Sequence, residues 1–332
     1  MINYIINYFV PFLLGLILVI LTMPSFVKRM HAQGFTGKDM NKFSKPLVAE
    51  LGGVIVFLGF SFALFSAIFI STYFKFITID LAIVLAGFCT IAIIAFIGFI
   101  DDIIGWKKGI RQWQHALFPI VAAIPLIAIQ AGQTTMTFPI FGTIDFGIFY
   151  ALIIIPIGIT GATNAFNMLA GFNGLEAGQG IILTLTLTII AFLTGETSAM
   201  ILGVAMICAL IGFLIFNKYP AKIFGGDSLT LMVGANLAVM SIIGNMETIG
   251  VMIFALFFIE FLIKAKHKFQ SECFGIAKKD GSLAHNPKGG SLTHIILKLG
   301  KDKLTEKQLV GAIIGIQGLI CLIIIGIYFL VR

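Results

Sequence analysis

Charged residues are scarce in this sequence: they make up 11% of it, whereas hydrophobic residues make up 59%. Soluble globular domains carry about 25% charged residues, so this composition excludes a soluble domain and indicates an integral membrane protein. Cysteine is also rare, with four residues and no CxxC pair, which argues against a disulfide framework or a zinc site. The first apolar stretch follows no basic segment and has no small-residue cleavage site, so we interpret it as a retained spanning helix and not as a signal peptide.

Long apolar stretches recur from one end of the sequence to the other. Each has about 20 residues, enough to cross a hydrocarbon core of roughly 30 Å as a helix. They predict an all-α membrane protein in which residues 1–332 form one polytopic domain, a bundle of about ten transmembrane helices. The predicted spans are about 5–24, 51–72, 81–100, 113–131, 147–163, 180–194, 199–216, 228–244, 248–264 and 308–331.

The basic residues are distributed unevenly between the two sides of such a bundle. All of the 22 Lys and Arg residues except Lys75 and Arg332 fall in segments on one side. The positive-inside rule places this side in the cytoplasm and both termini outside the cell membrane. The net charge of +7 is then explained by topology and by attraction to anionic lipid headgroups, and not by nucleic-acid binding. The predicted cytoplasmic loops are about 25–50, 101–112, 164–179, 217–227 and 265–307.

Two adjacent aspartates, Asp101 and Asp102, end the third predicted span in "AFIGFIDDIIGWKKGIRQW". One interpretation is a pair of solvated acids neutralised by Lys107, Lys108 or Arg111. Successive helical side chains diverge by about 100°, so the two acids face different neighbours. In the alternative interpretation, one aspartate serves a metal or phosphate site while the other holds a basic partner.

A glycine-rich turn with an acid, Gly225, Gly226 and Asp227, opens the eighth predicted span in "IFGGDSLTLMVGA". Aspartate at this position is typical of a helix N-cap. It is also typical of a phosphate and metal site, because glycines allow close backbone approach and a helix N-terminus favours anions. The motif alone favours the N-cap.

A polar insert, "TNAFNMLAGFNGLEAGQG", interrupts the apolar sequence between the fifth and sixth spans. Asn164 and Asn167 are three residues apart and share a helix face, and Gly171 and Gly174 precede Glu176. An interhelical hydrogen-bond motif accounts for part of this pattern. The density of amides and acids at one membrane face favours instead a cavity that binds a polar ligand, with oxygen ligands that suit Mg²⁺.

The long basic segment "LIKAKHKFQSECFGIAKKDGSLAHNPKGGSLTH" follows the ninth predicted span. A basic loop of this kind is usually a solvated, positive-inside loop. Its Lys and His side chains are also suited to closing over a nucleotide diphosphate, since lysine binds phosphate as a point charge.

Together these motifs resemble those of the polyprenyl-phosphate N-acetylhexosamine-1-phosphate transferases (glycosyltransferase family 4), in particular the archaeal and eukaryotic UDP-GlcNAc:dolichyl-phosphate GlcNAc-1-phosphate transferases. The resemblance covers nearly the whole chain. The asparagine-rich segment is long and specific, whereas "DD" or "GGD" alone would be weak. The matching segments, in the expected order, are "GKDMNK" at 37–42, "DD" at 101–102, "NAFNMLAGFNGLEAG" at 164–178, "FGGD" at 224–227 and "KAKHK" at 264–268.

The resemblance implies a ten-helix bundle with its active site on the cytoplasmic face. It implies transfer of GlcNAc-1-phosphate from UDP-GlcNAc to a polyprenyl (dolichyl) phosphate, giving polyprenyl-PP-GlcNAc and UMP in the first lipid-linked step of N-glycan or surface-glycan assembly. Mg²⁺ is the implied cofactor, with Mn²⁺ as a substitute. The implied partners are the two substrates and the lipid bilayer, and a homodimer is left open.

The resemblance also implies roles for individual residues. Asp101 and Asp102 are the implied catalytic residues, and Asn167 and Asp227 the implied metal ligands. The implied nucleotide-sugar contacts are Lys38, Asp39, Met40, Glu50, Gly171, Asn173, Phe224, Lys266, His267 and Lys268, with Asn173 near the uracil. The implied lipid-phosphate contacts are His115, Thr160, Gly161, Ala162, Thr163, Asn164, Ala165, Phe166, Asn167 and Met168.

The sequence departs from the family pattern at two places. Lys266, His267 and Lys268 stand where eukaryotic relatives have Arg-His-Arg, which keeps the charge and loses the bidentate guanidinium geometry. His115 stands where relatives carry a phosphate-binding lysine, and Lys107, Lys108 and Arg111 are the alternatives for that role. Two alternatives are a bacterial-type transferase that uses another UDP-sugar or undecaprenyl phosphate, and a secondary transporter. Transporter sites tend to lie near the bilayer midplane, whereas the acids here gather at one interface.

Overall fold

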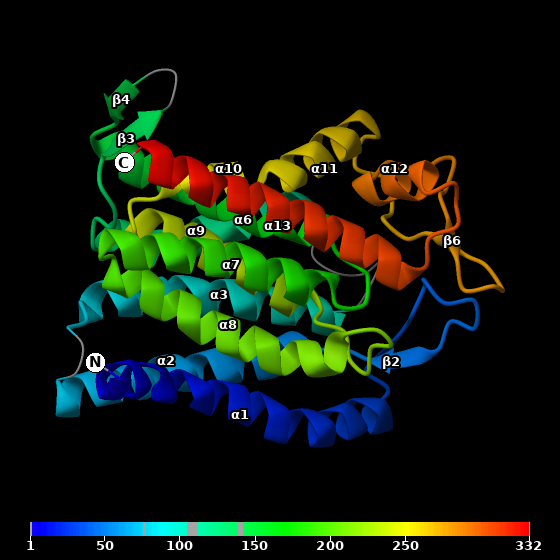
Figure 1. Ribbon diagram of the computed structural model, residues 1–332, viewed down its shortest axis with the longest axis horizontal. Coiled ribbons are helices and arrows are strands. Elements are labelled where there is room, and N and C mark those ends of the chain that lie inside the picture. The colour runs from blue at the N-terminus through cyan, green and yellow to red at the C-terminus, as the bar shows by residue number, and fades with distance from the viewer. Residues whose placement is uncertain (1, 76–77, 105–111, 139–141, 332) are drawn as a thin grey trace.

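The computed structural model describes residues 2–75, 78–104, 112–138 and 142–331, which form a bundle of helices aligned with its long axis (Figure 1). Mostly apolar sequence forms these helices because a helix satisfies all of its backbone hydrogen bonds within one segment. The helices are α1 (Ile2–Gln33), α2 (Gly52–Phe74), α3 (Leu81–Ile104), α4 (Gln112–Ala122), α5 (Ile124–Ala128), the π-helix η1 (Tyr150–Ile154), α6 (Ile155–Met168), α7 (Leu175–Thr194), α8 (Thr197–Asn217), α9 (Asp227–Ile243), α10 (Glu247–Ile253), α11 (Ala255–Lys266), α12 (Leu292–Leu299) and α13 (Glu306–Val331).

The prediction of a helical membrane protein is confirmed, but the predicted number of spans is not. Within the described ranges, seven helices are long and apolar enough to cross a membrane, or eight if the bent pair α10 and α11 counts as one span. These two helices meet at an angle of 60°. Shorter apolar helices occupy 117–128 and Asp227–Ile243. About ten spans therefore stays a prediction.

Three short antiparallel hairpins add strands that the all-α prediction omitted: β1 (Thr36–Lys38) with β2 (Leu47–Ala49), β3 (Thr135–Phe138) with β4 (Gly142–Asp145), and β5 (Ile276–Ala277) with β6 (Leu283–Ala284). The first and third hairpins lie at one end of the bundle together with α12 (Figure 1). We call this end, made of residues 34–51, 169–174, 218–226 and 267–305, the polar end. The start of α1 and the end of α13 lie at the opposite end, so both termini share one side.

Helix α9 forms the centre of the bundle, where every residue from Ser228 to Ile243 is buried. It packs against α3 on one side and α6 on another. Small residues permit this close packing, which matters in a membrane because lipid provides little hydrophobic drive for helix association. A Cβ at Gly234 would lie only 2.6 Å from the backbone of Ala162 and Thr163 on α6. Helices α3 and α6 are therefore both held closely against α9.

Candidate functional site

The N-terminus of α9 is capped by a residue of α3. The backbone N–H groups of Asp227 and Ser228 donate to the carboxylate oxygens of Asp102, at 2.7 and 3.0 Å. The predicted N-cap role of Asp227 is therefore wrong: the N-cap position is Gly226, and the capping acceptor comes from another helix. Gly226 has a φ of 75°, and a Cβ there would lie 2.4 Å from an Asp102 oxygen, so both the turn and the contact require glycine.

Thr230 links the segments that carry the two predicted metal ligands across the α6–α9 contact. The hydroxyl of Thr230 donates to the amide oxygen of Asn167 at 2.9 Å, and also lies 3.4 Å from the backbone oxygen of Asp227. Asp227 is the first residue of α9, and Asn167 belongs to the last turn of α6. The fold thus connects the Asn167 side chain, through Thr230, to the backbone at Asp227, which is 60 positions away in the sequence.

These two oxygen donors suit a magnesium ion that takes few ligands from the protein, and not a site in which the protein supplies the whole coordination shell. Among the described residues, no three His, Cys, Asp or Glu side chains form a group able to hold a metal. Mg²⁺ typically binds one or two carboxylates and completes its shell with water and substrate phosphate. One carboxylate, Asp227, beside one amide oxygen, Asn167, suits that mode. Asp101, the other member of the aspartate pair, is buried on α3.

The segment before Asp227 is fixed against the start of α2. The N–H of Phe224 donates to Ala49 at 2.8 Å, while Gly52 and Gly53 donate to the carbonyls of Phe224 and Gly225 at 2.9 and 2.8 Å. Phe224, which is predicted to flank the base, is half-buried. The predicted "FGGD" motif is therefore joined to the β1–β2 hairpin through backbone hydrogen bonds.

Asn173, which is predicted to lie near uracil, is a buried junction in this structure. Its amide nitrogen donates to Asp39 at 3.1 Å, its amide oxygen accepts from the Ala221 N–H at 2.7 Å, and its backbone N–H donates to Glu306 at 2.8 Å. Lys42 pairs with Asp39 at 3.0 Å and with Glu306. The structure thus assigns Asn173 and Asp39 to a network that joins three segments of the polar end to the start of α13.

Gly171 faces an aromatic ring from the long basic loop. It has a φ of 107°, and a Cβ at this position would lie 2.7 Å from the ring of Phe274. Asn41 ties the two segments together, because its amide donates to the Gly171 carbonyl at 2.8 Å and its oxygen accepts from the Gly275 N–H at 3.3 Å. Phe274 is half-buried and was not predicted. Gly171 therefore has an aromatic neighbour from the loop besides any contact with Phe224.

Glu50 lies beside the aspartate pair at the start of α2. Burial raises the pKa of the Glu50 carboxyl, and the neighbouring charge of Asp102 raises it further. A Cβ at Gly37 would lie 2.1 Å from a Glu50 oxygen, which places the carboxyl against the β1 strand. The other predicted contacts of this region differ in exposure: Lys38 is exposed and Met40 is half-buried.

A cavity of about 930 Å³ opens between η1, α6, α9, α10 and α11, and most of its lining is apolar. Seven of the predicted lipid-phosphate residues line it: Thr160, Gly161, Ala162, Asn164, Ala165, Asn167 and Met168. Thr163 and Phe166 do not, because both are buried in the core, where the Phe166 ring stacks on Phe257. The segment 160–168 thus presents one face to the cavity and the other to the core.

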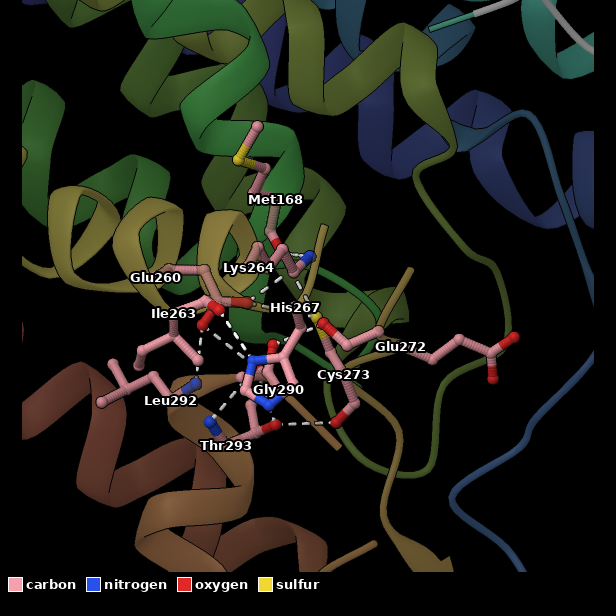
Figure 2. A network of polar contacts seen from close by, with 12 residues as sticks. Met168, Glu260, Ile263, Lys264, His267, Glu272, Cys273, Gly290, Leu292 and Thr293 are labelled. Carbon is pink, nitrogen blue, oxygen red and sulfur yellow. Dashed lines mark hydrogen bonds and ion pairs between the residues drawn. The ribbon is translucent and has the colours of Figure 1, made fainter. Parts of the chain in front are cut away.

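The three residues of the basic triplet at the end of α11 have different surroundings. Lys266 and Lys268 are exposed. A ring nitrogen of His267 contacts the Ile263 carbonyl at 2.9 Å, within its own helical turn (Figure 2). A Cβ at Gly290 would lie 2.4 Å from the same ring. His267 therefore packs the end of α11 against the basic loop.

Some predicted residues fall outside the described part of the structure. The side chain of His115, on α4, is one of them, and Lys107, Lys108 and Arg111 are the others. Conversely, the sequence did not indicate Glu306, Asn217 or Phe274. Asn217 is buried and joins the Gly174 N–H to the Ile223 carbonyl, at 3.1 and 2.9 Å. A lone asparagine at the end of an apolar helix was the only available signal for it.

Comparison of the sequence with known proteins shows several relatives of this chain. The chain is 36% identical to a protein of Saccharolobus solfataricus over 94% of both chains. It is 37% identical to one of Sulfolobus acidocaldarius, over 92% of this chain and 91% of the relative. Both relatives are provisionally named UDP-N-acetylglucosamine–dolichyl-phosphate N-acetylglucosaminephosphotransferase.

The model of glycosyl transferase family 4 matches residues 84–245. This chain belongs to glycosyl transferase family 4. A phospho-N-acetylmuramoyl-pentapeptide-transferase of Latilactobacillus sakei is 32% identical over 73% of this chain and 77% of the relative. The family match includes Asp101 and Asp102 on α3, Asn167 on α6 and Asp227 on α9.

Proposed function

We propose that this family 4 transferase moves GlcNAc-1-phosphate from UDP-GlcNAc to a dolichyl or related polyprenyl phosphate and releases UMP. The names of the two archaeal relatives support both substrates. The structural observation that carries the proposal is a mostly apolar cavity with Asn167 on its wall. A prenyl chain requires apolar surface, whereas its phosphate requires polar groups at one end of that surface.

The proposed reaction is an in-line phosphoryl transfer. An oxygen of the lipid phosphate attacks the β-phosphorus of UDP-GlcNAc and forms a new P–O bond. The bond between the β-phosphorus and the oxygen bridging to the α-phosphorus breaks, and UMP departs with that oxygen. A phosphomonoester has a second pKa of about 6, so the nucleophile is mostly ionised near pH 7 and requires no general base.

Asp227 and Asn167 would hold Mg²⁺ in this proposal. The ion would supply neutralisation of the charge that develops on the diphosphate. Asp102 acts as a positioning residue, because its hydrogen bonds orient the first turn of α9 and hence Asp227. The reaction depends mainly on positioning and electrostatics, as phosphoryl transfers do.

We also propose that the polar end faces the cytoplasm and that both termini lie outside. The basic residues of the segments at this end support this orientation through the positive-inside rule. A nucleotide sugar from the cytoplasm would then meet the lipid phosphate at the membrane interface, where Asn167 and Asp227 lie.

The test uses purified protein in detergent with Mg²⁺, radiolabelled UDP-GlcNAc and dolichyl phosphate. We expect one UMP for each labelled lipid that is extracted into organic solvent. A panel of UDP-N-acetyl sugars, with dolichyl and undecaprenyl phosphates, would identify the preferred pair. Uptake of label into proteoliposomes without a labelled lipid product would favour a transporter and exclude the proposed reaction.

A further inference from the structure

Two charged residues line the cavity, and they belong to opposite ends of the bent α10–α11 pair. Among the described lining residues, Glu247 in the first turn of α10 and Lys264 in the last turn of α11 carry charge. Glu247 contacts the Tyr150 hydroxyl, and the adjacent Thr248 bonds to Thr137 of the β3–β4 hairpin, far from the polar end. Lys264 is therefore the one cation among the described lining residues, and it lies at the end of the cavity occupied by Asn167.

The Lys264 ammonium has two acceptors close to the predicted metal site. It donates to the Met168 carbonyl, at the end of α6 and next to Asn167, and pairs with Glu260 at 3.4 Å (Figure 2). Its side chain is 13% exposed, so a ligand in the cavity can reach it. The Cys273 side chain also lies beside the ammonium, so a ligand oxygen would take the third N–H donor of the lysine in place of the sulfur.

Glu260 does not depend on Lys264 for its strongest hydrogen bonds. Its carboxylate is fully buried and accepts from the Leu292 N–H at 2.6 Å and from the Ser291 hydroxyl at 3.0 Å. Both donors belong to the start of α12, where the helix dipole also favours an anion. The Cys273 thiol contributes a longer contact of 3.7 Å. Because the charge of Glu260 is already stabilised, Lys264 can turn its ammonium toward a bound anion.

We propose that Lys264 binds the phosphate of the polyprenyl phosphate substrate and that Glu260 is a positioning residue that holds it at the mouth of the cavity. This inference rests on the proposed function. A phosphate at Lys264 would lie beside Asn167 with its prenyl chain along the apolar wall. Glu260 also joins this point to α12, so the basic loop is attached where the lipid headgroup enters.

The first experiment compares Lys264→Met and Lys264→Arg with the wild type in mixed micelles of fixed composition. A charged hydrogen bond to phosphate is strong, so we expect Lys264→Met to raise the KM for dolichyl phosphate about tenfold or more. The KM for UDP-GlcNAc should change less than twofold, and Lys264→Arg should recover most of the loss. Lys298→Met, at an exposed lysine on α12, is the matched control and should behave like the wild type.

The second experiment measures binding without turnover. Dolichyl phosphate and uncharged dolichol are compared by the shift each causes in the thermal midpoint. In the wild type the phosphate should give the larger shift, and in Lys264→Met the two shifts should be equal. This readout remains valid if the variant is less stable.

The outcomes distinguish a failure of the proposed function from a failure of the proposed role of Lys264. A wild type that produces no labelled lipid refutes the proposed function itself. An active wild type with an unchanged dolichyl-phosphate KM in Lys264→Met refutes the role of Lys264. A selective rise in the KM for UDP-GlcNAc would also overturn it, because the lysine would then serve the sugar diphosphate.

Discussion

The Asp102 carboxylate, at the end of α3, accepts a hydrogen bond of 2.7 Å from the backbone N–H of Asp227, the first residue of α9. This contact caps α9 and fixes the point from which the Asp227 side chain projects. Asp102 therefore acts on the site through the position of Asp227, although the two residues are 125 positions apart in the sequence.

Asp102→Asn should weaken this cap, because the amide group presents an N–H donor to one of the two backbone N–H groups. Losing a helix cap costs about 0.5–2 kcal/mol of stability. We expect a lower thermal midpoint and a kcat at least tenfold lower. Asp80→Asn is the matched control, since Asp80 accepts from the Ile83 N–H at 3.1 Å at the other end of α3. It should lower stability without changing kcat, and a wild-type kcat in Asp102→Asn would contradict the positioning role.

Lys42→Met should destabilise the polar end strongly. Lys42 is the counter-ion of Asp39 and Glu306, whose side chains are 4% and 2% exposed. Removing one partner of a buried ion pair costs about 3–5 kcal/mol, because the remaining charge is left uncompensated. Unfolding by denaturant would measure the loss. Lys42→Met combined with Glu306→Gln should recover part of it, whereas exposed Lys303→Met should have no effect; equal losses in the single and double variants would disprove the coupling.

Gly171→Ala should weaken UDP-GlcNAc binding by more than the backbone strain of a positive φ alone explains. A positive φ costs a non-glycine residue about 1–3 kcal/mol, and the added methyl group would also displace Phe274. Gly281→Ala isolates the strain, because Gly281 has a φ of 83° and no atom within 4 Å of its Cβ position. We expect both variants to lose stability and only Gly171→Ala to raise the KM for UDP-GlcNAc. Equal KM values for UDP-GlcNAc in the two variants would show that this face of Gly171 does not contact the nucleotide.

Glu50→Gln should stabilise the protein at neutral pH and weaken nucleotide-sugar binding. Burial and Asp102 raise the pKa of Glu50 above its ordinary 4.5, so the folded state holds this proton more tightly than the unfolded chain. Stability then falls as pH rises from about 4.5 through the raised native pKa and stays lower above it. Thermal midpoints measured across this range should show Glu50→Gln gaining on the wild type as pH rises. A difference in thermal midpoint between Glu50→Gln and the wild type that stays constant across this pH range would show that titration of Glu50 does not affect stability.

The sequence indicated which residues are candidates for the site, but not the contacts that hold them in place. Asn167 and Asp227 come from two recognisable motifs, and Thr230 links the two segments across the α6–α9 contact. The cap from Asp102 to α9 could not be predicted, because it depends on how closely α3 and α9 pack. Likewise, Lys42 and Glu306 are 264 positions apart, and no local pattern links them.

The helical bundle itself followed from apolar run lengths, whereas its irregular parts did not. The bend of 60° between α10 and α11 lies within a continuous apolar run that contains no proline. Helix α12 has eight residues within a basic, glycine-containing segment, so its local sequence resembles a loop. Both features shape the site: the bend contributes to the cavity wall, and the start of α12 stabilises Glu260.

The most direct test of this account is a Mg²⁺ titration of UMP release by the wild type and by Asp227→Asn, with UDP-GlcNAc and dolichyl phosphate as substrates. The exposed aspartate Asp280 supplies the matched control, Asp280→Asn. If Asp227 and Asn167 hold the ion, Asp227→Asn should lose at least 100-fold in kcat and require more Mg²⁺, while its thermal midpoint stays near that of the wild type. Near-normal Mg²⁺-dependent release of UMP by Asp227→Asn would contradict the proposed metal site.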